Sequence, residues 1–567
     1  MHFDLKRVPF SRYGSYFVIS HLKTTDKRME GCYLRIVRGG DNDIGAVFRI
    51  AIMKDGQEIS YTYEATPTEL MLDTEHGYVK WCIAENDFVH VQASGVGLRL
   101  HYEPGAYDYA IKLHEGHKRC WEVNSFKRET RFKLTPLVGD IMVDSQWEGL
   151  HSKHITLDCL TDKTTGKLEF TIEEYRAVPK KRDGYPSYEQ SLARVKMDYE
   201  AWVVRTLPSP APYEEARELA AYITWSCIVK ADGYLPRDAM YMSKNWMTNI
   251  WSWDHCFNAM ALIKTNPQLA WDQLMIFFDR QDESGMLPDF MNDRTALWNC
   301  CKPPIHGWTL KWMMDRTTFL TEDHYREIYA PLAAWTNWWL KHRDDDQDGI
   351  PQYNHGNDCG WDNSTVFLTS IPVESPDLCA FLILQMDILA QIADILGDET
   401  EANQWRTQAN DLLDRMLAHF WDGEKFVAMQ SGTHEGSTGD SLLLFMPIIL
   451  GDRLPHEIRV RLIAGLKETG RFLTENGLAT ESVKSSFYSS DGYWRGPIWA
   501  PSTMLLIDGL TRSGEREFAQ ELARKFCNMA ARNGMAENYN AITGEGLRDP
   551  AFTWTSSVFL ILTSEWV

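Results

Sequence analysis

After residue 213 the apolar residues recur with the helical period of about 3.6, and the connections between the helical segments alternate between short and long. Gaps after the even-numbered segments are a handful of residues, whereas every gap after an odd-numbered segment spans about 16 to 32 residues. Alternate connections in a ring of antiparallel helices lie at opposite ends, so six long loops share one rim. The pattern therefore predicts an (α/α)6 barrel whose long-loop rim carries the function.

Twelve helical segments make up this prediction. Their expected ranges are 214–231, 254–264, 267–281, 304–316, 322–343, 375–397, 400–421, 438–450, 456–469, 496–513, 515–533 and 552–564.

The first third of the chain has a different pattern. Residues 1–186 contain short alternating segments separated by Gly-Gly, Asp-Gly and Pro-Gly turns, which predicts an antiparallel β-sandwich domain. Residues 187–212 are expected to form one amphipathic linker helix followed by a Pro-rich connection. The catalytic barrel then occupies residues 213–567.

Composition excludes several classes of partner. The formal charge of −21 repels phosphate backbones and anionic lipid surfaces, so we expect no nucleic-acid and no membrane partner. No stretch approaches the roughly 18 consecutive apolar residues that span a bilayer. The N-terminus lacks the apolar segment of a secretory signal, and eleven scattered cysteines are typical of reduced thiols. These features predict a soluble, cytoplasmic protein; the oligomeric state stays open.

The long loops combine aromatic residues with carboxylates, amides and cations. Of the 22 tryptophans, 18 follow residue 210. Indole rings stack on the C–H faces of sugars, while carboxylates, amides and guanidinium groups bind sugar hydroxyls. This mixture favours a saccharide site, although tryptophan also fills large cores. The rim motifs are Trp251–His255, Lys302–Trp308, Gly360–Ser364, Tyr488–Trp499 and Glu537–Asn540.

Two carboxyl groups are the candidate catalytic pair. Hydrolysis of a glycosidic bond needs one protonated carboxyl to release the leaving oxygen and one ionised carboxylate on the other side of the anomeric carbon. Asp362 follows Trp361, whose ring can desolvate the carboxyl and raise its pKa, as a general acid requires. Glu537 precedes Asn538-Tyr539-Asn540, which can hold a water for a general base. The alternative is that each acid caps a helix or ends a loop.

The remaining candidates are for substrate binding, and several have structural alternatives. Asp254 can cap a helix instead, Trp253 can belong to the core, Arg495 can brace its loop through a salt bridge, and the role of Lys302 is open. The candidate substrate-binding residues are Trp253, Asp254, Lys302, Trp361, Asn363, Tyr488, Trp494, Arg495, Trp499 and Tyr539.

One acidic segment fits the first half of a calcium loop. Asp344, Asp346 and Asp348 supply oxygens at positions one, three and five, and a glycine follows at position six. Position twelve is His355 rather than glutamate, so an acidic turn is the alternative. Apart from this structural Ca²⁺, no cofactor is expected. His255, His306 and His355 lack metal-binding spacing and are expected to be ordinary polar histidines.

At these motifs the sequence resembles glycoside hydrolase family 63 and its bacterial relatives, which include mannosylglycerate-hydrolase-like and amylo-α-1,6-glucosidase-like proteins. The resemblance is carried by Trp251–Asp254, Lys302–Pro304, Gly360–Ser364, Tyr493–Trp499 and Glu537–Asn540. It implies an inverting, exo-acting hydrolase of α-glucosides or α-mannosides, with Asp362 as general acid and Glu537 as general base. It also implies sugar binding by Trp253, Asp254 and Trp361, and a structural calcium in some relatives.

The predicted function is therefore hydrolysis of a short oligosaccharide or small glycoside. A glycoside phosphorylase on the same barrel is one alternative, but it needs no base and would use several cations to bind phosphate. A sugar-binding protein without catalysis is the other alternative, which retention of both carboxyls disfavours.

Overall fold

The computed structural model describes residues 1–26, 28–115 and 118–567. The chain divides into two compact units. One unit contains Met1–Val204, Ala221–Lys230 and Ser243–Thr248, and the other contains Arg205–Ala220, Ala231–Met242 and Asn249–Val567.

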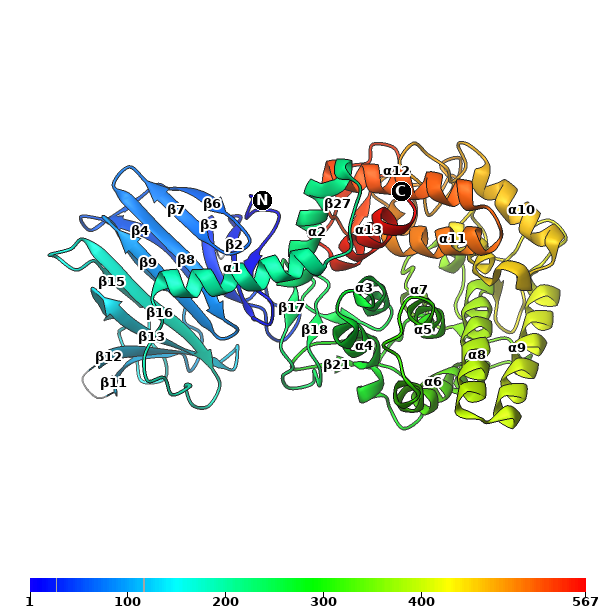
Figure 1. The fold of residues 1–567 in the computed structure, drawn as a ribbon, viewed down its shortest axis with the longest axis horizontal. Helices are drawn as coiled ribbons and strands as arrows, with labels where there is room; N and C mark the ends of the chain where they lie inside the picture. Colours follow the sequence, from blue (N-terminus) through cyan, green and yellow to red (C-terminus); the bar gives the residue numbers. More distant parts are fainter. Residues whose placement is uncertain (27, 116–117) are drawn as a thin grey trace. The chain divides into compact units, whose positions relative to one another are not determined.

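Most of the first unit consists of two antiparallel sheets of eight strands each. Figure 1 shows these strands in blue to cyan. One sheet has the order β1-β2-β3-β4-β10-β15-β14 with β5 paired to β4, and the other has the order β11-β12-β13-β16-β9-β8-β7-β6. The strands are β1 (Phe10–Ser11), β2 (Phe17–Leu22), β3 (Gly31–Ile36), β4 (Ala46–Lys54), β5 (Gln57–Ile59), β6 (Thr62–Ala65), β7 (Leu70–Thr74), β8 (Gly77–Glu85), β9 (Phe88–Ser94), β10 (Gly97–Tyr102), β11 (Tyr109–Glu115), β12 (Lys118–Ser125), β13 (Thr130–Val138), β14 (Asp140–Asp144), β15 (Ile155–Leu160) and β16 (Lys167–Tyr175).

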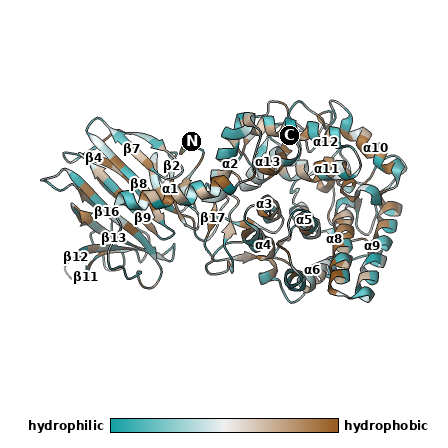
Figure 2. Cartoon of the chain, in the orientation of Figure 1, coloured by the Kyte–Doolittle hydropathy of each residue, from teal (hydrophilic) through white to brown (hydrophobic). Residues whose placement is uncertain are grey.

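The core of this unit lies between the two sheets. Phe17 on β2 and Phe48 on β4 contact Phe132 on β13, with ring centroids 6.2 and 5.5 Å apart. Hydrophilic and hydrophobic residues are mixed along the strands in Figure 2, as expected for strands with one buried face. The expected β-sandwich is confirmed.

Helix α1 (Tyr188–Arg205) follows the last strand and packs within the same unit. Its buried residues recur three or four positions apart, which places them on one face of the helix. The hydroxyl of Tyr188 donates to Glu69, and Ser191 Oγ lies 3.2 Å from His90 Nδ1 on β9. Tyr199 packs on Tyr222 and Trp225, and the indole of Trp202 donates to the carbonyl of Ala221, all within the same unit. The amphipathic face predicted from the sequence is thus covered partly by the sandwich and partly by residues 221–225.

The second unit is a ring of helices. Its helices and helical turns are η1 (Ala211–Tyr213), α2 (Glu214–Ser226, which the unit boundary divides), α3 (Asp254–Leu262), α4 (Pro267–Met275), η2 (Phe278–Arg280), α5 (His306–Met314), α6 (Glu322–His342), α7 (Gly356–Cys359), η3 (Thr365–Phe367), α8 (Pro376–Leu396), α9 (Glu399–Phe420), η4 (Leu442–Arg453), α10 (His456–Lys467), α11 (Ala500–Arg512), α12 (Arg516–Asn533) and α13 (Thr553–Glu565).

The inner ring of this unit is closed. Helix α3 contacts α5, α5 contacts α8, α8 contacts η4, η4 contacts α11, α11 contacts α13, and α13 contacts α3 again. Helices α4, α6, α9, α10 and α12 pack outside these members, and Figure 1 shows α8 and α9 side by side. The expected (α/α)6 barrel is confirmed, and each of the twelve expected segments contains a helix.

One expected helix differs in kind. The segment expected at 438–450 is η4, a run of 3₁₀ turns that Gly451 interrupts with non-helical backbone angles. Pro447 lies inside the run and lacks the N–H that an α-helix uses.

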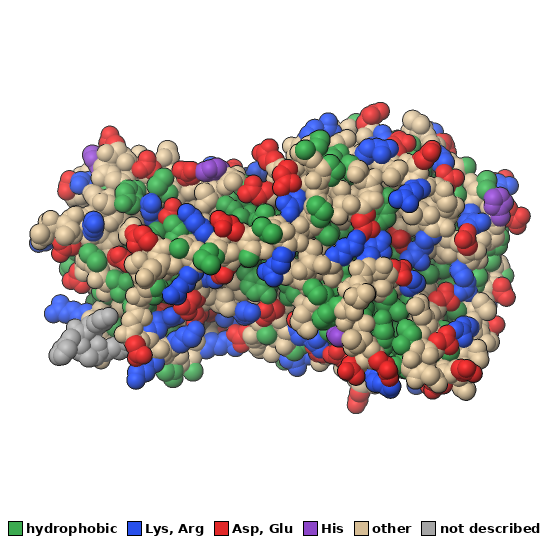
Figure 3. All heavy atoms as spheres, in the orientation of Figure 1, with side chains coloured by type: hydrophobic (Ala, Val, Ile, Leu, Met, Phe, Trp, Pro, Cys, Tyr) green, Lys and Arg blue, Asp and Glu red, His purple; other side chains and the backbone are tan. Residues whose placement is uncertain are grey.

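Helix α8 is long and apolar enough to cross a membrane by length and composition, but 78% of its most apolar window is buried inside the protein. It is the only such helix among the described residues. On the face drawn in Figure 3, acidic and basic side chains are interspersed.

Six long loops lead into the inner helices. We number them loops one to six, for residues 227–253, 281–305, 343–375, 421–441, 468–499 and 534–552. Small antiparallel sheets join them in pairs: β19-β20-β21 joins loops one and two, β22-β23-β24 joins loops three and four, and β25-β26-β27 joins loops five and six. The short strands, with β17 and β18, are β17 (Ile228–Val229), β18 (Ala239–Met240), β19 (Ile250–Trp251), β20 (Phe290–Met291), β21 (Ala296–Leu297), β22 (Gln352–Tyr353), β23 (Val373–Glu374), β24 (Met429–Gln430), β25 (Ile498–Trp499), β26 (Asn538–Tyr539) and β27 (Gly546–Leu547).

Candidate active site

Asp254 is the first residue of α3, where the N-terminal end of that inner helix meets the rim. The N-cap position is occupied by Trp253, so the alternative that Asp254 caps the helix is wrong. The side chain is 4% exposed. Burial raises the pKa of Asp254 to about 8, the charges of Asp289 and Asp362 raise it as well, and Lys302 lowers it. Asp254 is therefore shielded from water and lies near two other carboxyl groups, Asp289 and Asp362.

Lys302 is the buried cation of this group. Its ammonium lies 3.1 Å from Asp289 Oδ1 and donates to the carbonyl and side-chain oxygens of Asn357 at 2.8 and 2.7 Å. Burial acts to lower the pKa of Lys302, but Asp289 and Asp362 outweigh it, so the pKa is raised. The ammonium thus ties loop two to loop three and supplies positive charge beside the carboxyls. Substrate binding by Lys302 stays a prediction.

Asp362 lies in loop three, directly after α7 and Gly360, which ends that helix in the left-handed conformation. Burial raises the pKa of Asp362, Asp289 raises it as well, and Lys302 opposes the shift. The direction is the one expected for a group that must carry a proton.

Asn363, which follows Asp362 in the sequence, forms hydrogen bonds with the backbone of loop five. Its Nδ2 donates to the carbonyl of Gly492 at 3.0 Å, and its Oδ1 accepts from the backbone N–H of Trp494 at 2.9 Å. Both ends of the amide are used to connect loop three with loop five. Asn363 therefore connects the two loops, and its predicted contact with substrate stays a prediction.

Glu537 lies in loop six and is 4% exposed. Burial and the charge of Asp549 raise the pKa of Glu537 to about 8, and Arg548 opposes the shift. Two of the neighbours expected to hold water point elsewhere: the hydroxyl of Tyr539 donates to Gly534, and Asn540 Oδ1 accepts from the backbone of Ile542. Asn538 differs from both, because its side-chain nitrogen and oxygen are buried without a partner among the described residues, so it still has groups that can hold a water. The raised pKa does not agree with the expectation that these neighbours keep Glu537 ionised.

The prediction that Tyr539 binds substrate is also corrected. It is fully buried, packs on Phe526 and also accepts from the backbone N–H of Ala536, so it supports loop six from below.

The predicted aromatic residues stack on one another. Trp494 is stacked on Trp499 with ring centroids 3.9 Å apart and on Trp361 at 4.7 Å, and Trp253 lies 6.1 Å from Trp494. The indole N–H of Trp499 donates to the carbonyl of Tyr493. Trp494 and Trp499 are at most 1% exposed. Their predicted sugar contact is corrected: they form the wall behind the acids. Trp253 and Trp361, each 2% exposed, belong to the same wall.

Two predicted substrate-binding residues, Tyr488 and Arg495, have polar atoms that form no hydrogen bond with a described residue. The hydroxyl of Tyr488 and Nε of Arg495 are buried atoms without a hydrogen-bond partner in the described part of the chain. The salt bridge considered as an alternative for Arg495 is not found among the described residues, and both groups can bind sugar hydroxyls.

Sequence reasoning missed Tyr493, which stood out only as part of a longer motif. Burial raises the pKa of its hydroxyl, and the charges of Glu537, Asp362 and Asp254 raise it further. The Tyr493 hydroxyl is thus the group on which the charges of all three carboxyls act. Its backbone has φ 63°, uncommon for a bulky residue. Arg548, which contacts Asp491 at 2.8 Å and acts on Glu537, was also missed.

The acidic segment expected to bind calcium brings its three carboxylates together. Asp344, Asp346 and Asp348 offer oxygens within 4.8 Å of one another. His355, at position twelve, accepts from the backbone N–H of Asn357 and caps α7 instead. The donors thus fit a calcium ion only in the first half of the loop, and calcium binding stays a prediction.

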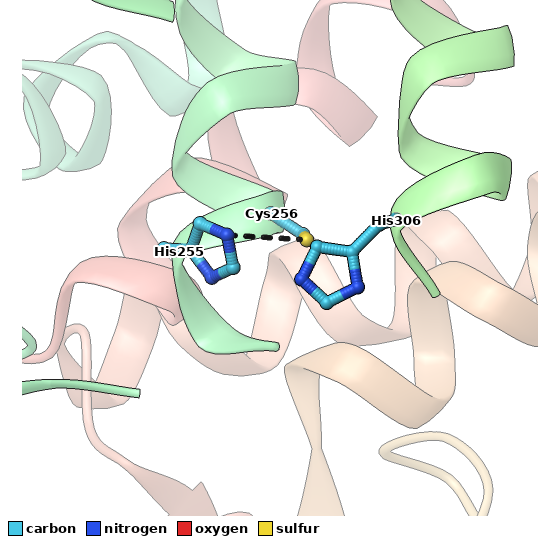
Figure 4. A group of neighbouring side chains, drawn as sticks. All are labelled: His255, Cys256 and His306. Carbon is cyan, nitrogen blue, oxygen red and sulfur yellow. Dashed lines mark hydrogen bonds between the residues drawn. The ribbon is translucent and has the colours of Figure 1, made fainter. Parts of the chain in front are cut away.

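Behind Asp254 lies a buried group of His255, Cys256 and His306, drawn in Figure 4. Cys256 Sγ lies 3.8 Å from His255 Nε2, and His255 Nδ1 lies 3.0 Å from the carbonyl of Trp251. Burial lowers the pKa of His255 to about 3 and that of His306 far below its usual value. Both imidazoles are therefore neutral and pack in the core between α3 and α5.

Comparison with known proteins places the helical unit in a family. Residues 247–555 match the mannosylglycerate hydrolase MGH1-like glycoside hydrolase domain. Mannosylglycerate hydrolase MGH2 of Selaginella moellendorffii is 22% identical over 394 residues, which are 55% of this chain and 79% of the relative.

Two solved structures share the fold. The GH63 mannosylglycerate hydrolase of Thermus thermophilus in complex with glucose has a TM-score of 0.53 at 20% identity and covers 61% of this chain and 99% of its own. A bacterial glucoamylase complexed with acarbose has a TM-score of 0.60 at 11% identity and covers 99% of this chain and 93% of its own.

The closed (α/α)6 ring described above is the fold that this chain shares with the two solved glycoside hydrolases. The family match covers more than half of the chain. The chain belongs to the mannosylglycerate hydrolase MGH1-like glycoside hydrolase family, and the resemblance to family 63 seen in the motifs is confirmed.

Proposed function

We propose that the protein is an inverting, exo-acting hydrolase that cleaves an α-glucosidic or α-mannosidic bond in a short oligosaccharide or small glycoside. The observation that carries this proposal is the set of three carboxyls, Asp254, Asp362 and Glu537, whose charges all raise the pKa of the Tyr493 hydroxyl. Asp254 and Glu537 are buried, and Asp362 is partly exposed. Asp362 and Glu537 come from loops that lead into α8 and α13, which are opposite members of the inner ring. Opposite placement leaves room for a water between the acid and the base.

In this mechanism Glu537 takes a proton from the water as its oxygen attacks the anomeric carbon. Asp362 donates its proton to the glycosidic oxygen while the bond to the leaving group breaks. The water enters on the face opposite the leaving group, so the anomeric configuration inverts. Asp254, with Tyr488 and Arg495, is assigned to hold the hydroxyls of the glycone.

The raised pKa values of Asp362 and Glu537 determine how kcat/KM depends on pH. Glu537 must lose its proton to act as a base, and burial holds its pKa at about 8. Asp362 must keep its proton, and burial raises its pKa too. We therefore expect kcat/KM to rise as Glu537 ionises and to fall as Asp362 does, with the two apparent pKa values belonging to the coupled pair.

The class of substrate follows from two considerations. Six long loops at one rim favour a site closed around a sugar end over a groove for a polymer. The family name and the relatives point to small glycosides with a glycerate aglycone, so glucosylglycerate and mannosylglycerate head the panel. Short α-linked glucose oligosaccharides complete it. The prediction of a cytoplasmic enzyme that needs no cofactor for its chemistry accompanies the proposal.

NMR of the first-formed sugar tests the mechanism. We expect the β-anomer from an α-glycoside, before mutarotation, and the same rate with or without phosphate. Release of the α-anomer, or a sugar phosphate as product, would overturn the proposal.

Variants test the two roles separately. Asp362→Asn and Glu537→Gln should each lower kcat/KM by at least about 10²–10⁴-fold, because each removes one proton transfer. With an activated leaving group that needs no protonation, Asp362→Asn should recover most of its activity, whereas Glu537→Gln should stay impaired. Glu545→Gln, an exposed change in the same loop, is the control and should keep full activity.

A further inference from the structure

A second cluster of ionisable side chains lies away from the predicted catalytic pair, where loops three and four meet the end of α9. Asp348, Glu374, His419 and His434 each offer one ligand atom, and these atoms lie within 4.8 Å of one another. Asp348 is in loop three, Glu374 on β23, His419 in the last turn of α9 and His434 in loop four. Four residues far apart in the sequence therefore converge on one point.

The separations suit a small cation. His434 Nε2 lies 3.5 Å from Asp348 Oδ2 and 3.9 Å from Glu374 Oε2. His419 Nε2 lies 2.7 Å from Glu374 Oε2, and its Nδ1 lies 3.8 Å from Asp348 Oδ2. Ligands of a tetrahedral zinc ion, each about 2.0 Å from the metal, lie about 3.3 Å apart. His434 Nε2 is close to this spacing from both carboxylates, whereas His419 Nε2 and Glu374 Oε2 are hydrogen-bonded and must separate by about 0.6 Å to share an ion. One ligand atom from each of the four residues nevertheless lies within 4.8 Å of the others, so rotation of side chains is enough to close the site.

Glu374 supplies an independent observation. It is fully buried, and one of its oxygens, Oε1, has no hydrogen-bond partner among the described residues. A buried carboxylate oxygen without a partner is costly, because it has lost its water without gaining a donor. The contacts with the two histidines use the other oxygen, Oε2, so a cation that takes both oxygens of Glu374 would remove that cost. His434 is 44% exposed at its side chain, which gives an ion a path from solvent.

We propose that Asp348, Glu374, His419 and His434 form a binding site for a divalent transition-metal ion such as Zn²⁺. Two imidazoles and two carboxylates are the mixed nitrogen and oxygen donors that such ions prefer, whereas calcium takes oxygen donors almost alone. The site is distinct in its donors from a calcium loop, because Glu374, His419 and His434 lie outside residues 344–355.

The ion has a structural role in this proposal. It joins loop three, loop four and α9 next to the sheet β22-β23-β24, in which Glu374 pairs with Gln352 and Met429. Glu374 also lies two residues before α8. Binding therefore holds the strand that leads into an inner helix, and no step of the glycoside chemistry passes through the metal.

Metal binding to the full-length protein tests the proposal directly. Protein stripped with a chelator is dialysed against ZnCl2 or CaCl2, and bound metal is measured by mass spectrometry. We expect about one zinc per chain, retained against excess calcium, with a higher Tm than the stripped protein. Cobalt in place of zinc should give the visible absorption of a tetrahedral site with nitrogen ligands.

Single variants assign the ligands. Loss of a residue that only supports a metal ligand typically weakens metal binding by about 10–100-fold. Loss of a ligand itself should cost at least as much, so we expect at least this effect on zinc binding in His434→Gln and in His419→Gln. His456→Gln, an exposed histidine at the start of α10, is the matched control and should bind zinc as the parent does. Because His434 is partly exposed, His434→Gln should still fold and can test the site even if His419→Gln does not fold.

Two outcomes would overturn the site. One is stripped protein that takes up no zinc above the level of the double variant His419→Gln/His434→Gln. The other is calcium binding that is tighter than zinc binding and unchanged in both histidine variants. Neither outcome depends on glycoside hydrolysis, so failure here leaves the proposed function untouched.

Discussion

The carboxyl of Glu537 carries a thermodynamic cost that follows from its burial. A carboxyl whose folded pKa is about 8 holds its proton more tightly in the folded protein than in the unfolded chain. Between the ordinary glutamate pKa and about 8 the folded state binds more protons, so the free energy of unfolding falls as pH rises. Above pH 8 the full cost remains. A general base placed out of water thus destabilises the enzyme under the conditions in which it works.

Glu537→Gln should consequently be inactive but more stable. At pH 8 we expect the free energy of unfolding to rise by roughly 4 kcal/mol, since the pKa rises from 4.5 to about 8 on folding and each tenfold difference in proton affinity corresponds to about 1.4 kcal/mol. The gain should shrink to a few tenths of a kcal/mol near pH 4.5, where the parent carboxyl is protonated in the folded state and about half protonated in the unfolded chain, and it should vanish below that pH. Thermal unfolding of parent and variant across this pH range measures it. Equal gains at pH 5 and pH 8, or a gain of the same size in the exposed control Glu545→Gln, would contradict the assignment.

For single residues, the sequence predicted which acids gather at the rim but not what surrounds them. Asp254 and Asp362 were recognisable from their aromatic neighbours. The groups beside Glu537 in the sequence, Tyr539 and Asn540, turn into their own loop, because neighbours along a chain point in different directions. Asp289 could not be found, since its role depends on Lys302 reaching it across the fold.

Among the helices and loops, α7 is the short helix that positions the predicted acid. Gly360 ends it with φ 75°, and a Cβ there would lie 2.7 Å from the ring of Trp253. Loop three therefore packs its backbone directly on the aromatic wall. Gly397 ends α8 with φ 83°, and a Cβ there would meet nothing within 4 Å.

These two glycines form a matched pair. Gly397→Ala should cost only about 1 kcal/mol, the penalty for a left-handed alanine. Gly360→Ala should cost more and should also lower kcat/KM, because either loop three or Trp253 must move beside Asp362. Thermal unfolding and kinetics on the preferred glycoside test the pair. Equal loss of stability in both variants, with kcat/KM unchanged in Gly360→Ala, would show that the close packing has no catalytic consequence.

The helices themselves were predictable because their pattern is local. Apolar spacing and the alternation of loop lengths need only the sequence, and both the twelve segments and the closed ring agree with it. The 3₁₀ geometry of η4 was not predicted, since apolar spacing alone does not distinguish it from an α-helix, even with Pro447 inside the run. The pairing of loops by small sheets was also not predicted, because two-residue strands are too short to leave a pattern.

In the architecture as a whole, the helical ring closes where α3 meets α13. Asn258, fully buried on α3, donates to Thr553 at 3.3 Å and accepts from Ser557 at 2.8 Å, and both partners are on α13. A polar contact in a buried place connects the start of the ring with its end.

Asn258→Ala should therefore lower the free energy of unfolding by about 1–3 kcal/mol, because it leaves two hydroxyls buried without their partner. Asn403→Ala on the outer helix α9, where the side chain is exposed, is the control and should change stability little. Denaturant unfolding measures both. A loss in Asn258→Ala no larger than in the control would mean that the closure does not rely on this contact.

The joining of loops in pairs by β19-β20-β21, β22-β23-β24 and β25-β26-β27 has a consequence for how such enzymes diversify. A loop that shares a sheet with its neighbour cannot be lengthened or exchanged alone without breaking that neighbour's strand pairing. A pair is then the smallest unit that can be exchanged, and the contacts that join loop three to loop two through Lys302 and to loop five through Asn363 must be kept when a pair is replaced. Transplanting a whole pair from a relative together with these contacts should transfer its sugar preference, whereas transplanting one loop should only damage the host.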